Sequence, residues 1–235
     1  MRKLTTLLAT SLLFLASLPS HAITWVSSSV RDPVSGHRVK VSEPASSGSY
    51  IYQYPEKSDQ VFWPYTDDNW LWFNPKSGYI AFGSDFEGLE PSKSKEMKAW
   101  LKEHFDRENL PRSRLELLTW AEKVYATRGM NDDFWCHYYR LMAFETRSNP
   151  VLSLEYVRKA LPLLIARNQS EQEPGQQMET LYLLSEYNRR LGRDDEATRF
   201  LEQLSSIQST NDLASFKTYL LKIAEEQRAS NIVLQ

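Results

Sequence analysis

The sequence contains a single cysteine, Cys136, among its 235 residues. This excludes a disulfide framework within the chain and any metal site built from several thiolates. The 28 basic and 30 acidic residues nearly balance, so there is no excess of positive charge of the kind that binds nucleic acid. With eight glycines and 11 prolines, the chain also has no room for long low-complexity linkers. The composition is that of a globular protein with one or two domains.

Patterns that carry catalysis or hold a cofactor are missing as well. The sequence has no GxSxG motif, no phosphate-binding glycine loop and no dinucleotide fingerprint, and its histidines do not occur in HExxH spacing. Cys136 and His137 are adjacent on a predicted helix, so their side chains diverge and do not form a nucleophile–base pair. We therefore expect a protein that is not an enzyme, with no catalytic residues and no cofactor.

Residues 1–22 have the order of a secretory signal. Arg2 and Lys3 form a basic start, and an apolar run follows from Leu7 to Leu18. This run is shorter than the ~20 residues that a helix needs to span a bilayer. We expect cleavage after Ala22, no membrane span in the mature chain, and a periplasmic or secreted product.

Two regions with different hydrophobic periods follow the signal. Residues 23–90 are rich in Ser, Val, Tyr and Trp and contain short runs typical of strands. The expected strands are His37–Ser42, Tyr50–Tyr54, Asn69–Phe73 and Tyr79–Phe82. Residues 91–235 show the three-and-four spacing of helices. The predicted fold class is α+β, with a small β-rich domain followed by an all-α domain.

Capping signals divide the second region into helices. Ser113 and Glu116 make a capping box for a helix that Gly129 ends. Pro162 is expected to kink or end the helix that begins at Asn149. The short connections predict antiparallel neighbours. The expected helices begin near Ser113, Asn131 or Asp132, Asn149, Pro174, Asp194 and Asp212.

The helices on either side of Gly192 resemble a tetratricopeptide repeat. A small residue on each helix would let the two approach closely, and the glycine would take the left-handed turn between them. Two positions depart from the usual repeat, because Asn188 stands where Tyr is usual and Ser209 where Pro is usual. A generic helical bundle is the alternative. The matching positions are Leu181, Leu184, Ser185, Gly192, Ala197 and Leu201.

A five-residue motif occurs twice in the first region. Residues 32–36 read Asp-Pro-Val-Ser-Gly and residues 74–78 read Asn-Pro-Lys-Ser-Gly. If each Asx and each Ser were cysteine, both would read CPxCG, the knuckle that supplies two thiolates to a zinc ribbon. The alternative is that two turn sequences match by chance, since Asx, Pro, Ser and Gly are all common in turns.

This arrangement resembles an uncharacterised bacterial family, a domain of unknown function that pairs two CPxCG knuckles with tetratricopeptide-like helices. The resemblance continues through residues 120–125 and 133–141. It implies a degenerate zinc-ribbon-like N-terminal domain followed by a tetratricopeptide-like helical domain. The family's metal binding does not carry over, because no cysteine occupies the four knuckle positions, and we expect no bound metal. Those positions are Asp32, Ser35, Asn74 and Ser77.

Aromatic residues are concentrated at Trp63, Trp70 and Trp72. Strand alternation predicts Trp70 and Trp72 on one sheet face, with Leu71 and Phe73 on the other. If the tryptophans face solvent, they can stack on sugar rings. If they are buried, they form the core of a small domain that has lost its metal.

We predict from these features an exported, non-enzymatic scaffold or adaptor that binds another envelope protein through its helical surface. Tetratricopeptide resemblance implies this role by analogy. The alternative is a glycan-binding module that uses the tryptophan patch, and a hydrolase built from scattered residues ranks third.

Overall fold

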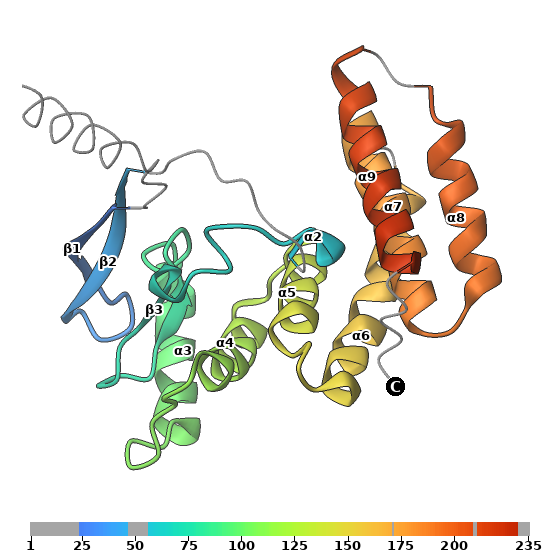
Figure 1. Ribbon diagram of the computed structural model, residues 1–235. Helices are drawn as coiled ribbons and strands as arrows, with labels where there is room; N and C mark the ends of the chain where they lie inside the picture. The colour runs from blue at the N-terminus through green and yellow to red at the C-terminus, as the bar shows by residue number, and fades with distance from the viewer. Residues whose placement is uncertain (1–23, 47–55, 171, 209–210, 230–235) are drawn as a thin grey trace, which may run out of the picture.

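The computed structural model describes residues 24–46, 56–170, 172–208 and 211–229. Within these residues, two small β-sheets precede a succession of helices, which confirms the expected α+β class (Figure 1). The expected signal at 1–22 and the expected strand Tyr50–Tyr54 lie outside the described residues.

Each of the two sheets is an antiparallel hairpin closed by one copy of the repeated motif. Strands β1 (Thr24–Arg31) and β2 (Arg38–Ser46) pair with Arg31 opposite Arg38. Strands β3 (Leu71–Phe73) and β4 (Ile80–Phe82) pair with Phe73 opposite Ile80. The two Asx-Pro-x-Ser-Gly segments therefore occupy equivalent places, at the ends of two separate hairpins.

The helices follow the capping signals closely. The caps expected at Ser113, Asn131 and Asn149 are confirmed, since each side chain accepts a hydrogen bond from the amide three residues later. Gly129 ends its helix with a φ of 70°. The helices of the described residues are α2 (Glu56–Asp59), α3 (Pro91–His104), α4 (Arg114–Arg128), α5 (Asp132–Glu145), α6 (Pro150–Asn168), α7 (Pro174–Arg190), α8 (Asp194–Ser206) and α9 (Asn211–Ala229).

Pro162 does not end a helix, because α6 continues through it to Asn168. The proline ring is exposed, whereas Leu161 and Leu164 on either side of it are buried. Burial of this apolar side of the helix offsets the lost backbone hydrogen bond. Tertiary packing has here overridden a local breaking signal.

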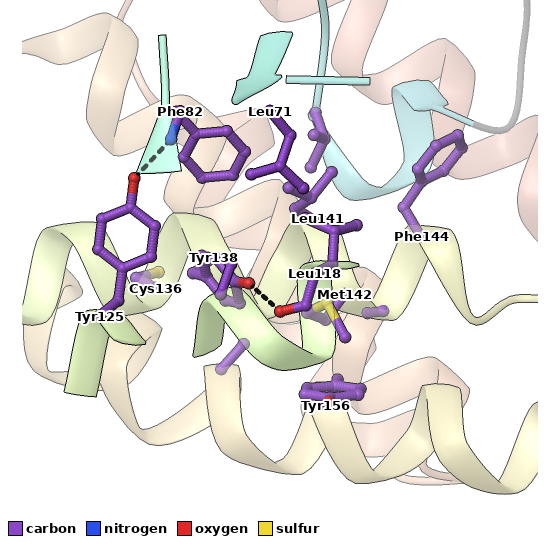
Figure 2. Packing of buried hydrophobic residues seen from close by; sticks show 14 of the residues in the cluster. Leu71, Phe82, Leu118, Tyr125, Cys136, Tyr138, Leu141, Met142, Phe144 and Tyr156 are labelled. Carbon is purple, nitrogen blue, oxygen red and sulfur yellow. Dashed lines mark hydrogen bonds between the residues drawn. The ribbon is translucent and has the colours of Figure 1, made fainter. Parts of the chain in front are cut away.

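The β-region and the helices share one continuous cluster of buried side chains. Figure 2 shows Phe82 of β4 facing Tyr125 of α4, whose hydroxyl accepts a hydrogen bond from the Phe82 amide at 2.8 Å. The Phe82 ring also lies 6.0 Å from the ring of Tyr138 on α5. The second hairpin is thus anchored to the helices by aromatic packing and by a buried hydrogen bond.

The helices pack as successive hairpins. Helix α5 packs against α6, α7 packs against α8, and α9 lies against both α7 and α8. In the α7–α8 hairpin, Ser185 donates a hydrogen bond to the carbonyl oxygen of Ala197 at 2.7 Å. Gly192, between these helices, has a φ of 71°. A side-chain hydrogen bond to a facing backbone requires close approach of the two helices.

Enlarging Ala197 should therefore destabilise the protein. Ala197 is 1% exposed, so Ala197→Leu is expected to overpack the α7–α8 crossing and lower the free energy of unfolding by about 1–3 kcal/mol. Ala166 is exposed near the end of α6, and Ala166→Leu is expected to change stability by less than about 0.5 kcal/mol. Thermal unfolding followed by circular dichroism measures both. Equal, small effects would show that the two helices do not pack closely.

Candidate functional site

The two Asx-Pro-x-Ser-Gly turns face each other, and their polar side chains meet at one atom. Oδ2 of Asp32 accepts hydrogen bonds from Ser35 Oγ at 2.8 Å and from Ser77 Oγ at 2.6 Å. It also accepts one from Nδ2 of Asn74 at 2.5 Å. Asp32 is 0% exposed and Asn74 is 3% exposed. The structure thus brings together all four positions that the sequence motif singled out.

The backbones of the two turns are also equivalent. In each turn the amide of the first motif residue donates a hydrogen bond to the carbonyl of the residue that follows the motif, at 2.9 Å. The amide of the motif glycine donates to the carbonyl of the first residue, at 2.8 Å. The fifth residues, Gly36 and Gly78, have φ values of 74° and 84°, in the left-handed region that favours glycine. The first side chain accepts the amide of the third residue at 2.7 Å in one turn and 3.0 Å in the other.

The environment of Asp32 keeps its carboxyl group charged. Burial by itself raises its pKa, but hydrogen bonds from Ser77, Ser35, the Val34 amide and Asn74 together hold the pKa below its ordinary value. A carboxylate only accepts hydrogen bonds, which matches the three side-chain donors directed at it. The site is therefore a buried carboxylate stabilised by hydrogen bonds from neutral donors.

These four side chains do not suit zinc. They offer one carboxylate, one amide and two hydroxyls, whereas zinc prefers thiolate, imidazole and carboxylate ligands. The three donor atoms also lie 2.5–2.8 Å from Asp32 Oδ2. Two ligand atoms of one tetrahedral ion would lie about 3.3 Å apart, given metal–ligand distances of ~2 Å. The observed separations are shorter and are those of direct hydrogen bonds. Among the described residues, no group of three or more His, Cys, Asp or Glu side chains is placed to hold a metal ion.

The two turn glycines differ in what surrounds them. A Cβ on Gly78 would lie 2.3 Å from the Phe105 ring, whereas a Cβ on Gly36 would meet nothing within 4 Å. The Phe105 ring cannot easily move, because it packs against the rings of Phe73 and Trp120.

Alanine should therefore be tolerated less well in the second turn. Gly36→Ala is expected to cost about 1–2 kcal/mol, from the left-handed backbone alone. Gly78→Ala is expected to cost about 1–3 kcal/mol more, because it also displaces Phe105. Urea unfolding of the two variants gives the comparison. Similar losses of stability in both would mean that Phe105 does not pack on the turn.

The tryptophans do not form an open patch on a sheet face. Trp70 lies in a short 3-10 turn, η1 (Asp68–Trp70), because Asp67 caps the backbone there, and β3 begins only at Leu71. Trp72 is 7% exposed, and its indole nitrogen donates to the carbonyl of Ser42 at 3.2 Å. The expected strand Asn69–Phe73 is therefore shorter than predicted, and Trp70 lies outside it.

The Trp72 ring contacts the Trp70 ring edge to face, with ring centroids 6.1 Å apart, so the two rings are neighbours. Trp63, the third member of the predicted patch, lies in the loop before β3 and is half-buried. Since Trp72 is buried, it does not offer an open ring face on which a sugar can stack.

Cys136 and His137 carry no activated nucleophile. Cys136 is buried, and this burial raises the pKa of its thiol, which favours the unreactive protonated form. Burial, with a smaller effect from Arg140 and Arg167, lowers the pKa of His137 from 6.5 to about 4, so its ring is neutral at pH 7.

Sequence analysis missed a buried polar network around α2. Oδ1 of Asp59 accepts hydrogen bonds from the Tyr187 hydroxyl and from Nη1 of Arg190, both at 2.9 Å. Arg140 donates to the carbonyl oxygens of Asp59 and Gln60. A four-residue helix leaves no periodic pattern to detect.

One signal for this network was present in the sequence. Arg140 lies four residues after Cys136 and four before Phe144, and both of these are buried on α5. An arginine on the buried face of a helix must have partners.

No protein-family model, curated protein or solved structure matches this chain. Among the described residues, no helix combines the length and the apolar content needed to cross a membrane. The functional interpretation therefore depends on the residues and their geometry.

Proposed function

We propose that the protein is an exported, non-enzymatic adaptor whose helical region binds another envelope protein, in the periplasm or outside the cell. Export is inferred from the basic, apolar and small segments of residues 1–22, with cleavage after Ala22. The adaptor role is inferred from the helical region. Neither Cys136, His137 nor Asp32 has the environment of a catalytic group.

The observation that carries the adaptor role is the stacking of helical hairpins, α5–α6 and α7–α8, followed by α9. The left-handed Gly192 and the close Ser185–Ala197 contact support a tetratricopeptide-like arrangement of the α7–α8 hairpin. Stacked hairpins of this kind build an extended surface that recognises other proteins. The step from architecture to function is by analogy.

We further propose that the β-region descends from a zinc ribbon. Support comes from the equivalence of the two turns and from the position of Asp32, whose carboxylate lies where four knuckle side chains meet. A chain that passes into an oxidising compartment without these thiols cannot pair them wrongly. The glycan-binding alternative gains no comparable support, since Trp72 is buried.

Site-specific photo-crosslinking in cells that produce the protein tests the adaptor role. Val151 and Ile165 are exposed aliphatic residues of α6, at 71% and 41%, and Val26 on β1 is a control of similar character at 44%. A benzoylphenylalanine at Val151 or Ile165 is expected to form an adduct with one envelope protein, and the same group at Val26 is not. That partner should then bind the purified chain. Absence of any adduct from the helical positions, or adducts from Val26 alone, would contradict the proposal.

A further inference from the structure

Helix α2 lies against three helices that are not consecutive in the chain. It contacts α5, α7 and α9. Helices α5 and α7 are the first helices of the α5–α6 and α7–α8 hairpins, and α9 follows the second of these. Figure 1 shows α2 beside one end of α5. The short segment 57–60 therefore lies across a face to which three separate helices contribute.

The side chain of Asp59 is held mainly by α7. Tyr187 and Arg190 both donate to its Oδ1 at 2.9 Å, and the Asp59 and Arg190 side chains are 6% and 8% exposed. Hydrogen bonds to a buried charged group are stronger than those between neutral groups. Asp59 is thus the principal charged contact of the segment with the helices.

The backbone of the segment is held by α5. Arg140, 4% exposed, donates Nε to the carbonyl oxygen of Asp59 at 3.0 Å and Nη2 to the carbonyl oxygen of Gln60. In all these contacts the helices supply the donors and the segment supplies the acceptors. A peptide that presents a carboxylate beside two backbone carbonyls offers these side chains the same acceptors.

Each arginine of this face also has a partner outside the segment. Arg140 also pairs with Glu179 of α7 at 2.6 Å, and Arg190 also donates to the hydroxyl of Ser153 on α6 at 2.6 Å. Three residues of the segment belong to α2, a helix of four residues that is too short to be stable alone, and Gln60, which follows the helix, has a φ of 49°. Exchange of this segment leaves neither arginine without a hydrogen-bond partner.

We propose that the α5/α7/α9 face is a peptide-binding site, that residues 57–60 occupy it as an internal ligand, and that an aspartate-bearing segment of a partner protein replaces them. This inference rests on the proposed adaptor function and names the chemistry of the partner. The partner's aspartate takes the place of Asp59 between Tyr187 and Arg190, and its backbone carbonyls bind Arg140. The internal segment keeps the site closed until such a partner is present.

A fluorescent peptide with the sequence of residues 55–62 tests this inference against the full chain. Fluorescence polarisation is expected to show binding to the Asp59→Ala variant at least about tenfold tighter than to the unaltered protein, since loss of charge-assisted hydrogen bonds weakens the competing segment. The same peptide with alanine in place of its aspartate is expected to lose this binding. The Asp67→Ala variant is the matched control, because Asp67 accepts hydrogen bonds from Asn69 within its own loop, and it should behave as the unaltered chain.

Three results would overturn the inference. One is a folded Asp59→Ala variant, with its helical circular dichroism intact, that binds the peptide no better than the unaltered protein. Another is equal binding of the aspartate and alanine peptides. The third is loss of the fold in both Asp59→Ala and the milder Asp59→Asn, which would make residues 57–60 an integral part of the core.

The peptide and crosslinking experiments fail independently. Peptide binding without a crosslinked partner would support the role of residues 57–60 as an internal ligand and contradict the adaptor function. A crosslinked partner without peptide binding would leave the adaptor function and place its contact on another surface.

Discussion

A variant with cysteine at all four knuckle positions is expected to bind one cobalt or zinc ion per chain, and the natural sequence is expected to bind none. The four side chains already meet at Asp32 Oδ2, so four sulfurs would surround that point. Structural zinc sites in small peptides bind with about 10–16 kcal/mol, so the gain in affinity should be large. Cobalt titration under reducing conditions, followed by thiolate–metal absorption, measures it. The substitutions are Asp32→Cys, Ser35→Cys, Asn74→Cys and Ser77→Cys.

The matched control restores only one knuckle, with Asp32→Cys and Ser35→Cys. Two thiolates leave a tetrahedral site half complete, and binding should be much weaker than in the four-cysteine variant. Equal affinity in the two variants would show that the two turns do not share one metal-sized centre. It would also remove the main support for descent from a zinc ribbon.

Replacing Asp32 by alanine is expected to lower the free energy of unfolding by about 3–5 kcal/mol. The change removes a buried carboxylate and leaves Ser35, Asn74 and Ser77 without the acceptor that all three share. Buried donors without partners are costly because they have lost their hydrogen bonds to water. Urea unfolding gives the magnitude.

Asp106 provides the matched control for Asp32→Ala. Its carboxylate also accepts backbone amides two and three residues later, but it is exposed. Asp106→Ala should destabilise the chain much less than Asp32→Ala. Comparable losses would mean that the contribution of Asp32 is confined to its own turn and does not include the contact between the two turns.

The lowered pKa of Asp32 also predicts a dependence of stability on acid. Because the pKa is below its ordinary value of 3.8 in the folded protein, the stabilising effect is complete above that value and is lost as the pH falls through the folded pKa. Asp32→Asn should remove this part of the acid sensitivity. An unchanged dependence of unfolding on pH below about 4 in that variant would contradict the assigned environment.

Local features of the fold could be read from the sequence because they depend on residues only a few positions apart. The capping box of Ser113 and Glu116 and the left-handed Gly129 set the limits of α4 through hydrogen bonds and backbone preferences within one turn. The two Asx-Pro-x-Ser-Gly turns are local in the same sense. Their common pattern was sufficient to identify Asp32 and Asn74 as matching positions, although it carried no information on the distance between them.

Tertiary structure decided where these local pieces meet. Asp32 and Ser77 are 45 residues apart in sequence and Asp59 and Arg190 are 131 apart, yet each pair is joined by a hydrogen bond. Trp70 and Pro162 also departed from their local patterns, one under a neighbouring aspartate cap and the other within a packed helix. The sequence by itself thus determined the turns, the caps and most helix limits. The shared carboxylate between the turns and the segment held across α5, α7 and α9 arose only when folding removed their charges from water, since a buried charge must find its partners wherever the packed chain supplies them.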